Sequence, residues 1–234
     1  FSTYNDRWKE RDPNWKPAAY QKKQDPIRGV FAYVADGLLQ PGEEAPAHQP
    51  QLLPGQVKLK NINGDDKLNE EDMVLIGRND PKFIFGFNNN FSYKNFDLNI
   101  YMYGQVGKIA GANSYYDAWG SYGNRIKLGQ NVPVSFKDAW SSDNQTSTRP
   151  SFIESAYGTG DLFLQKISFL RIRNITLGYT VPISKSICNR LRVYADVNNP
   201  CVWTNWKGQD PETDSNTNAY PNVTSFSIGV DISF

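Results

Sequence analysis

The residues with the clearest capacity for chemistry lie in one oxygen-rich stretch, Lys60 to Asp72, which reads KNINGDDKLNEED. Calcium takes about six to eight oxygen ligands, and an EF-hand loop supplies them at fixed positions along the chain. The residues at those positions are Asn61, Asn63, Asp65, Lys67 (through its backbone carbonyl), Asn69 and Asp72. The spacing therefore predicts a possible calcium site in loop 61–72.

Two departures from the EF-hand pattern weaken this prediction. The first ligand is Asn61 rather than Asp, and Asp66 stands where a glycine normally permits the sharp turn. Asp tolerates a positive φ better than most residues, so the turn can still form. The alternative is a metal-free loop, in which Asx turns form unaided and Asn69 caps a short helical turn that has Asp72 near its third position.

A second group of residues suits an organic ligand. In the segments NSYYDAWGSYGN and FKDAWSS, aromatic rings lie among Asn, Asp and Ser. Flat rings stack on sugar faces while amides and carboxylates bond to hydroxyls, which is the composition of a ligand site. The predicted substrate-binding residues are Tyr115, Tyr116, Trp119, Tyr122 and Trp140. The alternative is that the same rings pack inside the loop as a short amphipathic helix or dock on another protein.

Enzymatic chemistry is not expected from this sequence. His48 is the single histidine, so a Ser-His-Asp triad or a histidine-based zinc site would rest on it alone. Asp and Glu scatter through the loops without a convincing acid–base pair. Charge is balanced, with 25 Lys and Arg against 24 Asp and Glu, and no basic run offers a nucleic-acid footprint. We expect no enzyme, no required cofactor and no nucleic-acid partner.

Strands must position these loops, because apolar and polar residues alternate through the last 150 or so positions. SFSIGVDISF, for example, places Phe226, Ile228, Val230, Ile232 and Phe234 on one face. Period-two alternation predicts a half-buried strand. The same pattern predicts strands at 82–93, 95–105, 166–181, 190–203 and 222–234.

The strand and loop lengths favour a transmembrane β-barrel. Strands of globular sheets are usually about 5–6 residues long, whereas a tilted membrane strand needs about 9–11. Short turns alternate with the long loops 106–165 and 204–221, as in outer-membrane barrels. The alternative is a soluble, secreted β-sandwich that binds glycans and holds a structural calcium ion, since it gives the same alternation.

This barrel would be incomplete on its own, because the smallest membrane barrels use about eight strands. We expect residues 1–81 to contain the end of a rising strand, at 1–10, and an extracellular loop region, and residues 82–234 to form barrel strands. No disulfide is expected between Cys188 and Cys201, because the strand between them separates them by about 30 Å.

Two pairs of side chains have predicted places at the outer end of the barrel. Arg171 and Arg173 lie above the apolar part of their strand, where contact with lipid phosphates or plain solvation at the rim would both fit. Trp203 and Trp206 are expected in the outer interfacial girdle.

Several stretches resemble the C-terminal part of SusC/RagA-type TonB-dependent outer-membrane transporters, across residues 54–107 and 168–234 and, less fully, 27–40. They include PGQVKLKNINGDDKLNEEDMVLIGRNDPKFIFGFNNNFSYKNFDLNIYMYGQVG, SFLRIRNITLGYTVP, LRVYADVNNPCVWTNWKGQDPE and YPNVTSFSIGVDISF.

The resemblance implies an importer in the outer membrane of a Gram-negative bacterium, built as an antiparallel barrel of about 22 strands with a periplasmic C-terminus. It implies an N-terminal plug and a TonB-contacting segment before Phe1, energy from the TonB–ExbB–ExbD complex, and a SusD-like surface lipoprotein as a lid. The implied substrate is an oligosaccharide or a peptide.

Overall fold

The computed structural model describes residues 18–21, 25–26, 28–110, 128–129, 131, 134–152, 156–183, 188–208, 210–213 and 220–234. Within these ranges the chain consists of antiparallel strands and two short 3-10 helices, so the predicted all-β fold class is confirmed. None of the described helices has the length and apolar character needed to cross a membrane. The expected strand at 1–10 lies outside the described residues.

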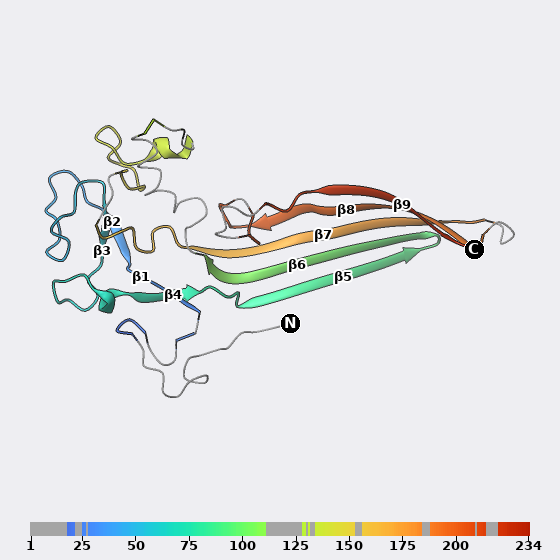
Figure 1. The fold of residues 1–234 in the computed structure, drawn as a ribbon, viewed down its shortest axis with the longest axis horizontal. Coiled ribbons are helices and arrows are strands. Elements are labelled where there is room, and N and C mark those ends of the chain that lie inside the picture. Colours follow the sequence, from blue (N-terminus) through green and yellow to red (C-terminus); the bar gives the residue numbers. More distant parts are fainter. Residues whose placement is uncertain are drawn as a thin grey trace.

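The main element is an elongated sheet whose strands follow one another in sequence (Figure 1). Its strands are β5 (Phe83–Tyr93), β6 (Phe96–Ala110), β7 (Gln165–Val181), β8 (Arg190–Thr204) and β9 (Ser225–Ser233). β6 continues five residues past the expected end at 105, and β9 begins three residues after the expected start at 222. Among the described residues, β5 and β9 each pair on one side only, so this sheet is open.

The register separates an apolar face from a polar face. Ile100 of β6 lies opposite Ile175 of β7, whereas the neighbouring Asn99 lies opposite Thr176. Because successive side chains alternate, each strand contributes to both faces. Large exposed side chains of the apolar face include Phe87, Phe91, Phe96, Leu177, Val193, Phe226, Ile228, Val230 and Ile232. Asn89 also lies on this face, opposite Ile100, and we have no physical account of it.

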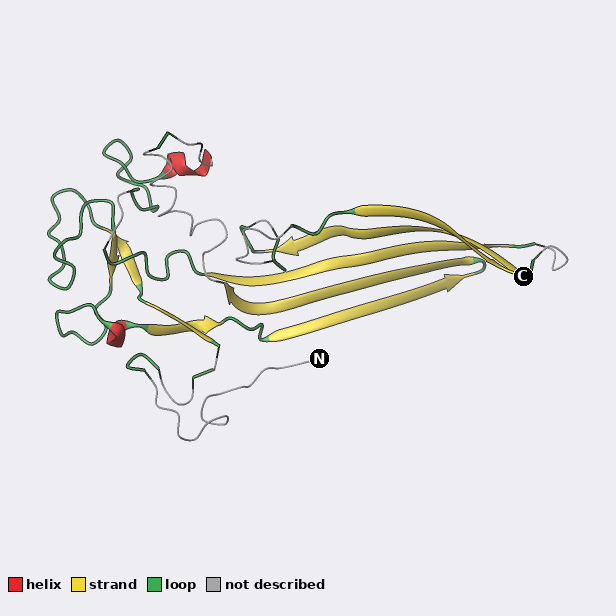
Figure 2. Ribbon diagram, in the orientation of Figure 1, coloured by secondary structure: helices red, strands yellow, loops and turns green. Residues whose placement is uncertain are grey.

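Smaller elements gather at one end of the long strands (Figure 2). They are β1 (Gly29–Ala32) paired with β4 (Val74–Arg78), β2 (Ala35–Leu38) paired with β3 (Val57–Leu59), and the 3-10 helices η1 (Glu70–Asp72) and η2 (Val134–Asp138). At the opposite end, β5 turns into β6 through Lys94 and Asn95, and Lys94 has a φ of 52°. Long connections and the minimal turn therefore lie at opposite ends of the sheet.

A buried cluster of Leu38, Val57 and Leu59 holds the loop region together. The fully buried side chain of Gln49 forms hydrogen bonds with the backbone of this cluster. Its Oε1 accepts from the backbone N–H of Leu59 at 2.7 Å, and its Nε2 donates to the carbonyl oxygen of Val57 at 3.4 Å. The side chain thus supplies partners that buried backbone groups require.

Replacing Gln49 with Met should therefore loosen β3, because it leaves the buried Leu59 N–H without an acceptor. Such an orphaned group costs about 1–3 kcal/mol. We expect the Leu59 amide to exchange its hydrogen about 5- to 150-fold faster, measured by hydrogen–deuterium exchange. Gln51→Met, at an exposed position nearby, is the matched control. Equal protection of Leu59 in both variants would contradict this role for Gln49.

Candidate functional site

The polar face of the sheet carries its interacting side chains in successive levels, beginning with an ionic cluster near the β5–β6 turn. Arg192 of β8 contacts Asp97 of β6 at 2.6 Å and Asp231 of β9 at 3.0 Å. Gly178 of β7 lies between Arg192 and Asp97, and a Cβ there would come within 2.5 Å of both side chains. The glycine is what allows the guanidinium to cross β7.

A second glycine of this face has a similar effect on an aromatic ring. Gly229 of β9 lies opposite Tyr194 of β8, and a Cβ at Gly229 would come within 2.3 Å of the ring carbon Cζ. The Tyr194 ring also lies 5.0 Å from the guanidinium carbon of Arg192, within the range of a cation–π interaction. Both long side chains therefore lie close against the sheet.

Further toward the loops, a band of hydrogen-bonded polar side chains crosses four strands. Its members are Asn88, Asn90, Asn99, Asn174, Thr176, Asp196 and Asn198. The Nδ2 of Asn99 donates to two asparagine oxygens of β5, at 2.6 and 2.7 Å. Asp196 is the one carboxylate of this band, and it accepts from a hydroxyl and from two amides. The band is therefore mostly uncharged.

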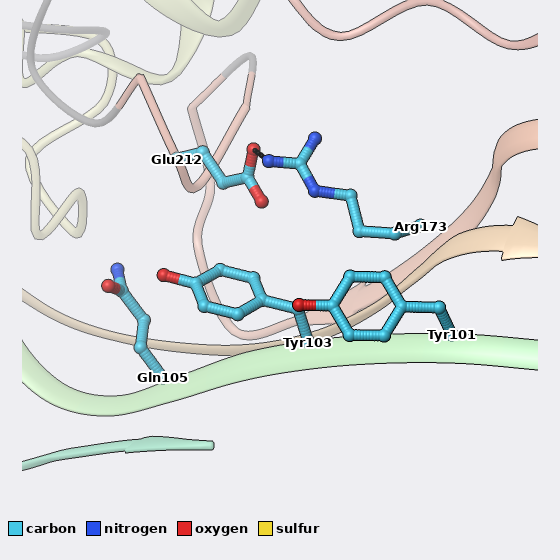
Figure 3. Close-up of a pocket in the computed structure, with 5 residues that line it drawn as sticks. All are labelled: Tyr101, Tyr103, Gln105, Arg173 and Glu212. Carbon is cyan, nitrogen blue, oxygen red and sulfur yellow. Dashed lines mark ion pairs between the residues drawn. The ribbon is translucent and has the colours of Figure 1, made fainter. Parts of the chain in front are cut away.

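Above this amide band lies an open cavity of about 350 Å³ (Figure 3). It is lined by Tyr101, Tyr103, Gln105, Arg173 and Glu212, which we call the tyrosine pocket. The residues from β6 alternate with Met102 and Gly104, so the three side chains project from the same face. Arg173 comes from β7 and Glu212 from the segment that follows β8.

Within the tyrosine pocket, Arg173 forms an ion pair with Glu212 and lies over the ring of Tyr103. Arg173 Nη2 lies 3.1 Å from Glu212 Oε2, and the Arg173 guanidinium lies 6.0 Å from the centre of the Tyr103 ring. Figure 3 shows the ion pair on one side of the pocket, with both tyrosine rings and Gln105 on the other. The arrangement presents flat rings, an amide and a closed ion pair to a ligand.

A buried ion pair holds Glu212 in place. Arg171 Nη2 donates to Asp210 Oδ1 at 2.8 Å, and both side chains are almost fully buried. The Asp210 carboxylate also accepts the backbone N–H groups of Glu212, at 2.9 Å, and Asn222, at 3.0 Å. Asp210 thereby ties two points of the β8–β9 connection to the polar face of β7.

The pKa of the Asp210 carboxyl follows from these contacts. Burial acts to raise it, but the N–H groups of Glu212 and Asn222 and the charge of Arg171 outweigh burial. The pKa consequently lies below its ordinary value. Arg171 also approaches Glu212, with its Nε 3.4 Å from Oε1, although this contact lacks hydrogen-bond geometry.

These positions correct two expectations about the outer end of the barrel. Arg171 and Arg173 contact carboxylates on the polar face and are not placed to meet lipid phosphates. Trp203 is exposed on the apolar face, beside Leu170, whereas Trp206 is buried against Ala110, Ile167 and Phe169. The two tryptophans therefore do not form one girdle. Cys188 and Cys201 are free thiols.

Of the predicted substrate-binding aromatics, Tyr115, Tyr116, Trp119 and Tyr122 lie outside the described residues. Trp140 is half-buried and packs against the cluster of Leu38, Val57 and Leu59. A Cβ at Gly55 would come within 2.2 Å of the Trp140 ring, so the ring lies against that backbone. Trp140 does not line the tyrosine pocket, and a substrate role for this set stays a prediction.

The tyrosine pocket itself was not predicted from the sequence, although a signal for it exists. Tyr101 and Tyr103 are aromatic residues on the face that otherwise carries Asn, Asp and Gln. Aromatic side chains on the polar face of a barrel strand need an explanation, and ligand contact is one. Glu212 has no such signal, because its position depends on how a loop folds back.

In loop 61–72 the side chains form the hydrogen bonds of the metal-free alternative. Asn69 caps η1 in a capping box with Asp72. The buried Asp72 carboxylate accepts the backbone N–H groups of Ile62, at 2.7 Å, and Asn69, at 3.0 Å. Asp66 has a φ of 60°, so an aspartate does occupy the left-handed conformation where an EF-hand has glycine.

The side chains of three further predicted calcium ligands also have partners inside the loop. Asn61, Asn63 and Asp65 accept the backbone N–H groups of Gly64, Asp65 and Lys67 at 2.6–3.1 Å. In the described part of the chain, no group of three or more His, Cys, Asp or Glu residues is arranged to hold a metal. Calcium binding in this loop stays a prediction.

The fold and the polar face define the chain as part of the wall of an antiparallel β-barrel. No protein-family model matches it. TonB-dependent receptor P3 of Formosa agariphila is 28% identical over an alignment of 236 positions, which spans 91% of this chain and 23% of that protein. TonB-dependent receptor SusC of Bacteroides thetaiotaomicron is 27% identical over 180 residues, covering 74% of this chain and 17% of SusC.

Solved structures show the same fold. The RagAB peptide transporter matches with a TM-score of 0.67 and 21% identity, over 88% of this chain and 23% of that chain. Together these relatives confirm the resemblance to SusC/RagA-type TonB-dependent receptors that the sequence motifs indicate. The chain spans less than a quarter of the length of the relatives it matches.

Replacing Asp210 with Asn should loosen the β8–β9 connection, because the buried Arg171 would lose its counter-charge. Breaking one partner of a buried pair typically costs about 3–5 kcal/mol. We expect trypsin to cleave after the exposed Lys207 at least tenfold faster in Asp210→Asn at neutral pH, followed by mass spectrometry. Asp143→Asn, at an exposed position in another loop, controls for the substitution itself. An unchanged cleavage rate would contradict the role of Asp210.

Acid should have the same effect as the Asp210→Asn substitution. A carboxyl whose pKa is lowered by folding stabilises the folded form at any pH above its unfolded pKa, which is about 3.9. The stabilisation is lost as the pH falls below about 4 and through the lower folded pKa of Asp210. Hydrogen exchange in segment 205–222, corrected for intrinsic rates, should therefore be unchanged from pH 8 to 5 and should rise below pH 4. A rise centred near pH 6 would contradict this assignment.

Proposed function

We propose that this chain is a section of the wall of a TonB-dependent importer in the outer membrane of a Gram-negative bacterium. One observation carries the proposal: long antiparallel strands keep an apolar face and a polar face along the sheet, across local register shifts in β6, β7 and β8. Acyl chains of the outer-membrane lipid would meet the apolar face, and the aqueous interior of the barrel would meet the polar face.

The open edges support a larger barrel. An unpaired strand edge in hydrocarbon costs several kcal/mol for each unsatisfied backbone group, so membrane sheets close. In the part of the chain that the structure describes, β5 and β9 each have one edge without a partner strand. The remainder of the same barrel would pair with both edges and would also contribute the plug and the TonB-contacting segment.

The direction of the strands supports an orientation. The C-terminus lies at the end of the sheet where β5 turns into β6, opposite to the region of long connections (Figure 1). Outer-membrane barrels place short turns in the periplasm and long loops outside. The C-terminus of this chain would therefore be periplasmic, and the tyrosine pocket would lie toward the extracellular end.

Import of a nutrient fits this arrangement better than catalysis. Relatives carry the names TonB-dependent receptor and peptide transporter. We infer that an oligosaccharide or a peptide binds near the extracellular end, beneath a SusD-like lipoprotein lid, and that energy from TonB–ExbB–ExbD opens the path. The chain would contribute the wall, the outer loops and the polar lining of the conduit.

The soluble β-sandwich is less well supported. A sandwich would need a second sheet packed about 10 Å from the apolar face. Among the described residues, Phe226 and Ile228 remain 76% and 83% exposed, and no other sheet covers them.

Spin labels at neighbouring positions of β9 test the orientation. In the full-length receptor in lipid bilayers, a label at Ile228 should relax faster with oxygen dissolved in the lipid. A label at Ser227, which faces the opposite side, should respond to an aqueous nickel chelate instead. Accessibility in the reverse sense would reject the membrane placement.

Uptake tests the transport function itself. Cells that carry the receptor should deplete a mixture of oligosaccharides and peptides in the medium, followed by mass spectrometry. An in-frame deletion of the receptor and a strain without TonB should fail to deplete the same components. Loss in the receptor deletion alone would indicate a surface receptor that does not depend on TonB.

A further inference from the structure

Resting on the proposed import function, we propose that the tyrosine pocket binds an uncharged sugar ring of the substrate, and that Glu212 sets this preference by excluding carboxylate-bearing ligands. The names of the relatives say nothing of this pocket or of Glu212. The inference rests on the charge, the rings and the polar lining of this part of the wall.

The charged side chains in and below the pocket neutralise one another in ion pairs within the protein. Arg171 pairs with Asp210, and Arg173 pairs with Glu212, so the cluster has two cations and two carboxylates. Arg173 is the cation that a ligand can reach, because its side chain is 36% exposed whereas that of Arg171 is 3% exposed. Glu212 occupies the Nη2 of Arg173, and a ligand carboxylate would have to displace it against like-charge repulsion.

The exposed surfaces of the pocket suit a ring with apolar faces and hydroxyl edges. Tyr101 is 39% exposed, and its ring lies beside that of Tyr103 on β6 (Figure 3). The tyrosine hydroxyls and the Gln105 amide offer both donors and acceptors without net charge. Apolar area with a few placed polar groups is the composition of a small-molecule site.

The lining below the pocket is consistent with an uncharged ligand. Tyr101 lies opposite Asn88 and Asn174, so the pocket leads directly into the amide band. The carboxylate of Asp196 in that band already accepts hydrogen bonds from Thr176, Asn174 and Asn198. A peptide would bring charged termini and side chains into this region, whereas a neutral glycan would exchange hydrogen bonds with amides.

The test removes the charge of Glu212 and measures binding to two classes of probe. The purified full-length receptor in detergent is titrated with neutral hexasaccharides (malto-, cello-, xylo- and mannohexaose) and with hexamers of galacturonate and alginate. The wild type should bind at least one neutral probe at least tenfold more tightly than either uronate probe. Glu212→Gln should raise the affinity for a uronate probe at least fivefold, because it frees the Arg173 guanidinium.

Matched variants identify the source of the change. The double variant Arg173→Gln/Glu212→Gln should lose the gain in uronate affinity, since no cation remains accessible. Tyr101→Leu should weaken the neutral probe at least fivefold, whereas Tyr93→Leu, on the apolar face, should not. On gels, all variants should resist heat denaturation equally, which establishes that they are folded barrels.

The proposal fails if Glu212→Gln leaves uronate affinity unchanged, if the wild type prefers uronates, or if no neutral probe binds. These measurements need no TonB and no import. If the receptor binds sugars but the uptake experiment fails, only the transport function is rejected. If cells take up peptides but the receptor binds no sugar, only this inference is rejected.

Discussion

The strand register is the constraint on which the rest of this structure depends. A shift of one residue in any pair would move every side chain of that strand to the other face. The pairing of Ile100 with Ile175 fixes Asn99 beside Thr176, and a register shift between Tyr101 and Met102 then places Tyr103 beside Arg171. The apolar face, the amide band and the tyrosine pocket are therefore consequences of how the strands are aligned, this register shift included.

The β8–β9 connection adds what the register alone cannot provide. Regular strands present side chains at fixed spacing, but the pocket needs a carboxylate that approaches from above β6. Asp210 supplies this by binding both Arg171 and the backbone around Glu212. A buried ion pair of this kind is weak evidence for overall stability, since desolvation offsets its attraction. Its effect here is on position, because it places Glu212 against Arg173.

Much of the fold was predictable because alternation is local and the apolar face is nearly continuous. The left-handed turn observed at Asp66 was compatible with the sequence, because aspartate tolerates a positive φ. The tyrosine pocket depends on contacts between residues that are far apart in the sequence. Arg171 and Asp210, for example, are 39 positions apart. Strict alternation from Ile175 would put Arg171 on the apolar face of β7, but the register shift between Ile172 and Asn174 brings it onto the polar face, where it meets Asp210. Trp206 was misplaced for a different reason, since it follows the end of β8, where alternation no longer determines direction.

Gly178 and Gly229 have a consequence for the width of the proposed conduit. With any larger residue at either site, Arg192 or Tyr194 would have to stand away from the wall and project toward the axis of the barrel. Because both side chains lie flat against the sheet, the half of this wall near the β5–β6 turn would take up little of the proposed lumen, even though it carries bulky groups. In the proposed barrel, free space on this side would thus depend on the absence of a Cβ at Gly178 and Gly229 as much as on the number of strands.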